Sequence, residues 1–383
     1  MTLSTARVFV FAVAALLVLG CGQKPVVWQV VIDNGGDETA SAIATDGNYF
    51  YVAGTASPTG KTDRAAWLIT RLTRDGREVW RRSYNQAARN VCEDITADSK
   101  GYAYAIGRSN PQDKQICLVV KYAPDGNVSW QKGLALGGKT LGMGICQVSG
   151  DRIAVCGMAG TDANADHMIV LLDGKTGQTI WARNHDICCA DLSVRIAADA
   201  KDNLAVIGQH GTADSVDIIV MKLNPRGETL WTRIYDSGGR DEAGDIAFDP
   251  VGNIVATGTA VIGDSVRCVI LEYDPDGGVI RKAAYGQNAQ AEGKGLYISP
   301  SGDIFVTGGL KGKTQNQVLV FQYQPSAISV WERQFWSGSG ARGVDLLVPG
   351  DAIVAATVEG KTSDMAVYRL ARVTAPKPPA ARP

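Results

Sequence analysis

The chain has 383 residues, of which 45% are hydrophobic and 20% charged, and its formal net charge is −1. This length is enough to bury a large core, either as two ordinary domains or as one large all-β domain. Lys and Arg are spread thinly and form no basic stripe that would neutralise phosphates. The composition therefore argues against a nucleic acid as partner.

The first twenty residues have the pattern of a signal peptide. Positive charge falls only at Arg7, and residues 8–19 form an unbroken apolar run that is too short for a comfortable membrane span. The run ends in Val18-Leu19-Gly20-Cys21, which resembles the bacterial lipobox, whose cysteine is lipidated and becomes the mature N-terminus. The alternative is an ordinary signal peptide followed by a chance cysteine.

We therefore expect a lipoprotein signal peptide over residues 1–20 and a lipidated tether over residues 21–25, anchored by the acyl chains on Cys21. Gly22 follows the cysteine instead of an aspartate, which by resemblance to enterobacterial sorting implies the outer membrane. No second apolar segment approaches membrane length. The Pro-rich end, residues 374–383, is expected to be a disordered tail.

A tryptophan recurs at intervals of about fifty residues. Six of the eight tryptophans are spaced by 52, 50, 51, 50 and 100 residues, and Arg281 fills the double gap; these are Trp28, Trp80, Trp130, Trp181, Trp231 and Trp331. A second marker, which recurs with the same period, is a short run that alternates β-branched and aromatic residues and ends in glycine, as in GNIVATG to Gly258. Turn residues separate the strands, and no stretch shows a sustained helical period.

Each repeat thus contains four strands, and seven repeats predict a seven-bladed β-propeller over residues 26–373. The ends of this region complement each other. Residues 26–31 (VVWQVV) form a lone fourth strand, and residues 366–373 (AVYRLARV) form the third strand of an incomplete last repeat. We therefore expect the N-terminal strand to complete the last blade and to remove an open sheet edge.

The repeat resembles a broad family of bacterial repeat propellers found in lipoproteins and cell-surface proteins. The unit reads W-x-x-x-Y, a Gly-rich stretch, D-E-A, D-x-x-G-N, V-A-T-G, a K-L strand and G-x-x-x-W, most fully over residues 231–258. Residues 173–181 (DGKTGQTIW) also resemble the tryptophan-docking motif of quinoprotein dehydrogenases and of a propeller lipoprotein in β-barrel assembly. That resemblance implies that the six repeat tryptophans dock neighbouring blades.

The longer and more variable loops of a four-stranded blade all emerge on one face, so we expect any binding site there, near the mouth of the central channel. Acidic residues begin the first strands, and basic residues interleave with them. The candidate ligand site consists of Asp94, Asp191, Arg195, Asp241, Asp245 and Lys294. Glu38 belongs to the same predicted ring of acids. The alternative is that these polar groups only bond loop backbone and stay solvated.

A second candidate site is a metal site, because imidazole and thiolate together are ligands of zinc and copper. It would use His185, Cys188, Cys189 and His210, although their spacing matches no known metal motif. The alternative is that they are loop or core residues. Cys146 and Cys156 flank a hairpin turn and are a possible disulfide, but the sequence leaves the pairing open.

These observations favour a non-catalytic, monomeric envelope lipoprotein that binds or scaffolds an envelope protein or glycan, with no cofactor. One alternative is an enzyme with a quinoprotein-like or metal-dependent site at the channel mouth. Another is an outer-membrane protein assembly factor. No repeat carries a concentrated set of catalytic residues, which favours the first interpretation.

Overall fold

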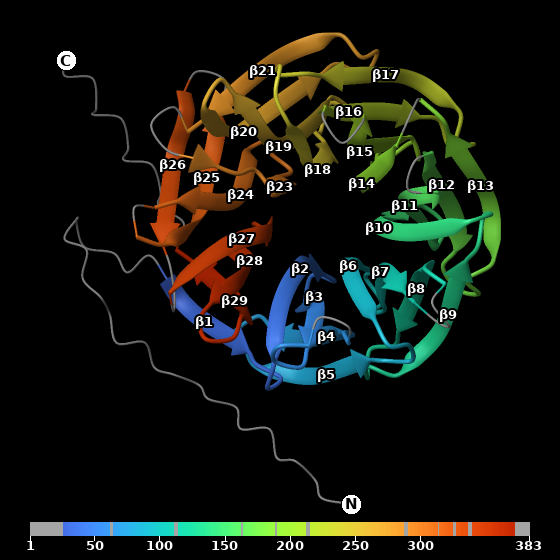
Figure 1. Ribbon diagram of the computed structural model, residues 1–383, viewed down its shortest axis with the longest axis vertical. Coiled ribbons are helices and arrows are strands. Elements are labelled where there is room, and N and C mark those ends of the chain that lie inside the picture. Colours follow the sequence, from blue (N-terminus) through green and yellow to red (C-terminus); the bar gives the residue numbers. More distant parts are fainter. Residues whose placement is uncertain are drawn as a thin grey trace, which may run out of the picture.

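The computed structural model describes residues 26–371 except 62–63, 111–113, 162–163, 188–189, 212–214, 287–289, 313, 325–326 and 336–338, and the side chains of residues 327–331 are not described either. The described chain folds into seven antiparallel sheets arranged as a ring around a central axis (Figure 1). Within it, no helix is long and apolar enough to span a membrane. The predicted seven-bladed propeller is confirmed.

The first four blades follow one another along the chain. Blade 1 contains β2 (Asp37–Thr45), β3 (Tyr49–Ser57), β4 (Ala66–Thr73) and β5 (Glu78–Tyr84). Blade 2 contains β6 (Asn90–Ala97), β7 (Ala103–Ser109), β8 (Ile116–Tyr122) and β9 (Val128–Leu134). Blade 3 contains β10 (Lys139–Val148), β11 (Arg152–Gly160), β12 (Ala165–Asp173) and β13 (Thr179–His185). Blade 4 contains β14 (Leu192–Ala198), β15 (Leu204–Gly211), β16 (Val216–Leu223) and β17 (Thr229–Tyr235).

The last three blades complete the ring. Blade 5 contains β18 (Asp241–Phe248), β19 (Ile254–Ile262), β20 (Ser265–Tyr273) and β21 (Val279–Tyr285). Blade 6 has a first strand in two pieces, β22 (Gln290–Ala291) and β23 (Gly295–Ile298), then β24 (Ile304–Lys311), β25 (Asn316–Gln324) and β26 (Ala327–Phe335). Blade 7 contains β27 (Gly340–Leu347), β28 (Ala352–Glu359), β29 (Asp364–Leu370) and, as its outer strand, β1 (Val26–Ile32).

The N-terminal strand closes the ring as expected. β1 pairs with β29 in antiparallel register, from Val26 opposite Leu370 to Ile32 opposite Met365. Blade 7 is therefore built from both ends of the propeller, which lie side by side in Figure 1. The edge of β29 is covered, so the blade presents no unpaired inner strand.

The hydrophobic core lies between neighbouring blades. Seven clusters of buried side chains each combine residues from two adjacent sheets, including the pair formed by blades 7 and 1. The two middle strands of each blade are covered on both sides; β3, for example, is buried at seven consecutive positions. This explains why the repeats read as nearly continuous apolar runs, as expected for strands covered on both faces.

The repeat tryptophans lie on the outer strands and contact the next blade. The indole Nε1 donates a hydrogen bond to a turn carbonyl of that blade in four cases: Trp80 to Pro124 (2.9 Å), Trp130 to Gly174 (3.1 Å), Trp181 to Pro225 (3.2 Å) and Trp231 to Pro275 (3.1 Å). Each of these rings also covers a turn glycine of positive φ. Trp28 covers Gly76 in the same way but its Nε1 has no partner. The side chain of Trp331 lies outside the described residues.

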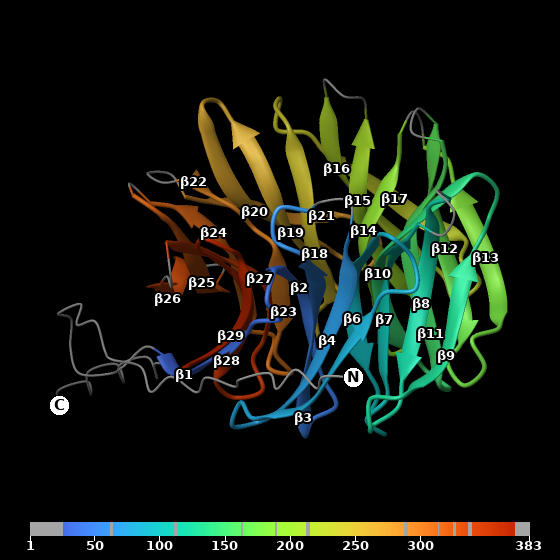
Figure 2. The same ribbon diagram turned by 60° about the horizontal axis from the view of Figure 1, so that its bottom comes forward.

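The two faces of the ring differ in their connections. Tight turns join first to second strands and third to fourth strands on one face, which we call the turn face. Asp249 shapes one of them, since its carboxylate accepts the amides of Val251 (3.0 Å) and Asn253 (2.8 Å). The other connections emerge on the opposite face, which we call the loop face (Figure 2). Val26 and Ala352 both pair with Leu370, so β1 begins at the turn face.

Five cysteines of the described chain are free thiols, Cys92, Cys117, Cys146, Cys156 and Cys268. Cys146 lies opposite Ala154, and Cys156 lies opposite Gly144, so the two cysteines beside the hairpin turn do not face each other. Burial raises the pKa of both thiols. They belong to the core, which corrects the disulfide that the sequence left possible.

Candidate functional site

The innermost strand of each blade lines the axis of the ring (Figure 1). In six blades this strand carries a β-bulge at the same place, for example between Cys92 and Asp94 or between Ser193 and Arg195. A bulge adds one residue to one strand and changes the direction of the side chains that follow it. The side chain of the residue after the bulge therefore points toward the axis of the ring.

Three of these positions hold an aspartate that joins two blades. One carboxylate oxygen accepts the amide of the next residue, and the other accepts an amide on the first strand of the next blade. Asp94 binds Ile95 (2.8 Å) and Ile145 (2.9 Å), Asp245 binds Ile246 (2.8 Å) and Leu296 (2.8 Å), and Asp345 binds Leu346 (2.7 Å) and Ile43 (2.9 Å). These aspartates hold the inner edges of adjacent blades together.

Arg195 occupies the same position in blade 4 and faces the three aspartates. Its Nη1 donates to the carbonyls of Met143 (3.3 Å) and Val194 (3.1 Å), its Nη2 to that of Ser41 (3.4 Å), and its Nε lies 3.9 Å from Asp94 Oδ2. Burial opposes its charge, but Asp94, Asp245 and Asp345 together raise the pKa of Arg195 above its usual value. We call these four residues the axial cluster.

Burial dominates the carboxyl groups of the axial cluster. It raises the pKa of Asp245 to about 6 and the pKa of Asp345 well above its usual value, with Arg195 opposing both shifts. The backbone already occupies the oxygens of all three aspartates. The cluster therefore serves to fasten the ring, and its polar atoms offer little to a ligand.

The structure divides the channel-mouth site that the sequence predicted. Asp94, Arg195 and Asp245 lie together in the axial cluster, and Asp345 joins them although the sequence reasoning missed it. Lys294 Nζ lies 3.4 Å from Glu242 Oε2, away from the cluster, in an ion pair. Asp241 and Asp191 lie at the loop-face ends of their blades, and each binds the loop before it. These residues do not converge on one point.

A buried polar cluster lies between blades 3 and 4. Asp191 Oδ1 lies 2.9 Å from His210 Nδ1 and 3.7 Å from His167 Nε2, and His167 Nδ1 lies 3.0 Å from Ser193 Oγ. His167, Ser193 and Asp191 are almost completely buried. Burial lowers the pKa of His167 to about 4, against the opposing effect of Asp191. Because the ring of His167 is buried, solvent and a substrate have no access to it in this structure.

The predicted metal-site residues are only partly described. His210 binds Asp191, whereas His185 Nδ1 lies 3.1 Å from Thr229 Oγ1 on the outer strand of blade 4. Burial lowers the pKa of His185, and Arg183 adds to this effect. Cys188 and Cys189 lie outside the described residues. A metal site that combines these four residues stays a prediction of the sequence.

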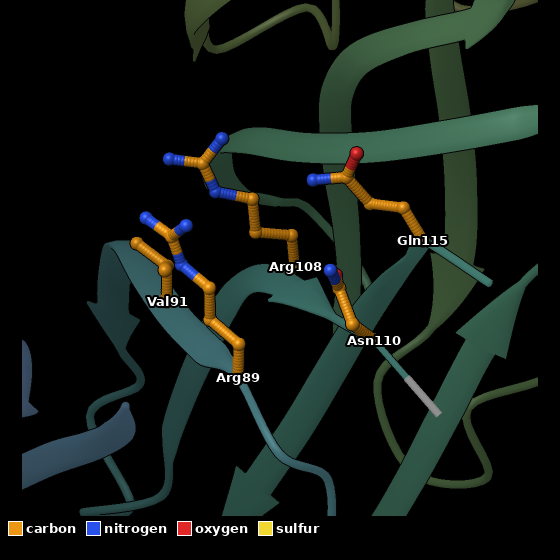
Figure 3. A pocket seen from close by; sticks show the side chains of 5 residues that line it. All are labelled: Arg89, Val91, Arg108, Asn110 and Gln115. Atoms are coloured by element: carbon orange, nitrogen blue, oxygen red, sulfur yellow. The ribbon is translucent and has the colours of Figure 1, made fainter. Parts of the chain in front are cut away.

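On the loop face, described residues line two pockets. The larger of these two, about 290 Å³, is centred on blade 6 and reaches blades 5 and 7; it is lined by Val266, Gln290, Glu292, Gly309, Leu310, Lys311, Asn316 and Arg342. The smaller, about 70 Å³, lies on blade 2 and is lined by Arg89, Val91, Arg108, Asn110 and Gln115. Figure 3 shows that the guanidinium groups of Arg89 and Arg108 project to the same side of this smaller pocket, next to two side-chain amides. We call it the arginine pocket.

The comparisons with known proteins show the fold alone. No protein-family model matches the chain, and no curated protein matches it. The resemblance to the bacterial lipoprotein repeat family therefore stays a prediction.

Solved propellers superpose on most of the chain. Drosophila Plexin A in complex with Semaphorin 1b has a TM-score of 0.54 and 9% identity, over 91% of this chain and 87% of that one. Chaetomium thermophilum Sqt1 bound to the N-terminus of a ribosomal protein has a TM-score of 0.51 and 12% identity, over 90% and 98% of the two chains. The propeller domain of the Trilobed protease from Pyrococcus furiosus, described as having an open velcro topology, has a TM-score of 0.51 and 10% identity, over 91% and 100%.

Proposed function

We propose that this protein is a lipid-anchored binding propeller of the bacterial cell envelope, which presents its loop face to a partner protein. The arginine pocket is the observation that carries the proposal, because it places two guanidinium groups and two amides around one opening. The partner contributes an acidic group to this pocket. The propeller itself acts as the rigid scaffold.

The charge of the arginine pocket suits a carboxylate. Arg108 is paired with Glu93 at 3.1 Å, whereas the exposed Arg89 forms no ion pair with any residue that the structure describes. One positive charge is thus left over, beside the amides of Asn110 and Gln115. Guanidinium groups bind carboxylates through two parallel hydrogen bonds, and amides add further donors. An acidic side chain or a chain end of the partner fits this chemistry.

The anchor would orient the loop face away from the membrane. β1 begins at the turn face with Val26, five residues after Cys21. Five residues span at most about 18 Å when fully extended. A lipid on Cys21 therefore keeps the turn face close to the bilayer and leaves the loop face accessible to an envelope partner.

The structural neighbours are consistent with a protein partner. Plexin A was solved in complex with Semaphorin 1b, and Sqt1 was solved bound to the N-terminus of a ribosomal protein. At 9% and 12% identity, the likeness to these propellers shows the fold alone. They support the class of function, binding of a protein, and leave the identity of the partner to experiment.

The proposal is tested by affinity capture from detergent-solubilised envelope with wild type and two charge reversals. Arg89→Glu reverses the unpaired charge of the arginine pocket, and Arg77→Glu reverses an exposed charge on a tight turn between β4 and β5. We expect a protein that is captured by wild type and Arg77→Glu to be lost with Arg89→Glu. Equal capture by all three chains, or capture of no protein by the wild type, would refute the proposal.

A further inference from the structure

Among the described residues, two clusters of three carboxylates lie on the loop face, each at a junction between blades. One joins blades 7 and 1 and consists of Asp33, Glu38 and Asp364; the other joins blades 4 and 5 and consists of Asp217, Asp236 and Asp241. Within each cluster, one oxygen from every residue lies within 4.8 Å of the others. We call them the closing cluster and the second cluster, because the first lies where β1 completes the ring.

The two clusters are built in the same way. One residue of each cluster, Asp33 or Asp236, follows an outer strand and accepts the amide of the glycine two residues later, at 2.7 Å and 2.6 Å. Those glycines have φ of 84° and 82°, the left-handed region that favours glycine. The next acid, Glu38 or Asp241, lies in the first strand of the following blade. The sequences DNGGDE (33–38) and DSGGRD (236–241) are two copies of this loop.

Glu38 is the observation that points to a ligand. Its side chain is completely buried, and neither of its carboxylate oxygens accepts a well-formed hydrogen bond, although the backbone amides of Asn34 and Gly36 lie close enough to favour its charge. No Lys, Arg or His in the described part of the chain forms an ion pair with any member of the closing cluster. In the second cluster, Asp217 Oδ1 is also buried without a partner, but the Asp217 side chain as a whole is only partly buried, and Ser237 donates to both oxygens of Asp241. A buried carboxylate without a partner is strongly unfavourable, so each site lacks a positive charge.

The electrostatics agree with the geometry. Burial raises the pKa of Glu38 to about 7, and Asp33 and Asp364 add to the shift, while the amides of Asn34 and Gly36 oppose it. Burial also raises the pKa of Asp217 and that of Asp241. Ser237 lowers the pKa of Asp241, and His210 lowers that of Asp217, but neither compensates for burial.

A third junction provides an internal comparison. Asp191 of blade 4 corresponds to Glu38 and Asp241, and there His210 places its ring nitrogen 2.9 Å from the carboxylate. Opposite Glu38 and Asp241 the neighbouring strand carries alanines, Ala56 and Ala260. The chain therefore supplies a polar partner of its own at the junction of blades 3 and 4. At the other two junctions the residue on the neighbouring strand offers only a methyl group, and Asp241 takes its hydrogen bonds from Ser237 in the loop instead.

We propose that the closing cluster and the second cluster each bind a calcium ion. Ca²⁺ prefers oxygen ligands at 2.3–2.6 Å, and three oxygens within 4.8 Å of one another can all reach one ion after a shift of at most a few tenths of an ångström. Each ion joins two blades, and the ion in the closing cluster joins β1 and β29 to β2. The ring closure thus becomes dependent on calcium.

The test is isothermal titration calorimetry. The purified full-length chain is first freed of metal with EDTA, the EDTA is dialysed away, and CaCl₂ is then titrated into the protein. We expect two ions per chain, with dissociation constants of about 0.1–1 mM, as in extracellular modules. Glu38→Gln and Asp241→Asn preserve side-chain size and should each abolish one of the two binding events. Glu242→Gln is the matched control, because this partly exposed neighbour pairs with Arg240 and Lys294 outside the cluster.

Thermal unfolding in EDTA shows whether each variant is folded, so that a loss of binding is not confused with misfolding. Calcium should raise the midpoint temperature of thermal unfolding of wild type and of Glu242→Gln. The increase should be smaller in Glu38→Gln and in Asp241→Asn. Two outcomes would overturn the proposal. One is the absence of calcium uptake at millimolar concentration, and the other is uptake that neither Glu38→Gln nor Asp241→Asn reduces.

Discussion

Replacing Trp231 with alanine should remove one complete contact between blades 4 and 5. The side chain is 9% exposed, and its Nε1 donates to Pro275 O at 3.1 Å. The ring centroid lies 5.8 Å from that of Tyr273, and Arg233 lies over the indole at 5.5 Å. A β-carbon on Gly277 would lie 2.8 Å from indole Cδ2, so the ring rests directly on that turn.

The size of the effect follows from these contacts. Truncating a buried tryptophan to alanine costs about 3–5 kcal/mol, through lost burial and the cavity that remains. About 1 kcal/mol of this belongs to the indole hydrogen bond. Trp231→Phe keeps an aromatic ring but loses the donor, and it should therefore cost about 1–2 kcal/mol.

Equilibrium unfolding in urea, followed by tryptophan fluorescence and by circular dichroism, measures the difference in free energy of unfolding. Trp181→Ala is an informative companion, because that indole is only half-buried and its hydrogen bond to Pro225 is longer, at 3.2 Å. It should cost less than Trp231→Ala. A cost below about 1 kcal/mol for Trp231→Ala, which is typical of a surface substitution, would refute the docking role.

Three further predictions concern the anchor, the closure and the pH dependence. Cys21→Ala should yield a protein that no longer incorporates labelled palmitate in growing cells, and continued labelling would exclude the lipobox. Deleting residues 26–31 leaves β29 without its outer strand and should lower the melting temperature strongly, whereas deleting residues 374–383 should leave it unchanged. In EDTA, the stability of wild type relative to Glu38→Gln should fall as pH rises from 4.5 to above 7, because the folded state holds the proton more tightly. The shift of the Glu38 pKa from 4.5 to about 7 corresponds to at most about 3.5 kcal/mol, and parallel pH profiles for the two proteins would contradict this assignment.

The fold could be predicted from the sequence because its repeat is dictated locally. Tight turns require Gly, Asp and Asn at fixed places, and each outer strand needs a ring that covers the next turn, as Trp80 covers Gly126. These requirements recur every fifty residues and set the number of blades. The closure followed from counting strands at the two ends, since an incomplete last blade needs the strand that begins the chain.

Burial was harder to predict than topology. Trp67 lies outside the repeating tryptophan position, so the repeat predicts no docking role for it. The structure buries it completely, on the third strand of blade 1. The corresponding position carries Cys117 in blade 2 and His167 in blade 3, both fully buried. The repeat period shows which positions of the blades correspond to one another. It does not show that one such position can hold tryptophan, cysteine or histidine and be buried in each case.

The sites depended on contacts that only the closed ring creates. Asp94, Arg195 and Asp245 were predicted at the channel mouth, whereas the bulges turn them into the axis, where they meet Asp345. Asp345 could have been found from the sequence, because Val344-Asp345-Leu346 matches Gly244-Asp245-Ile246 at the corresponding place in the repeat. Asp33 and Asp364 are more distant still along the chain, and only the pairing of β1 with β29 makes them neighbours.

The central claim, that the loop face binds a partner protein, is tested most directly by crosslinking in living cells. A photoreactive amino acid is placed either at Gln115 in the arginine pocket or at the exposed Asp125 on the turn face. We predict a discrete crosslinked product from position 115 that disappears when Arg89→Glu is added, and no such product from position 125. The same product from both positions, or a product from position 115 that persists with Arg89→Glu, would contradict the account.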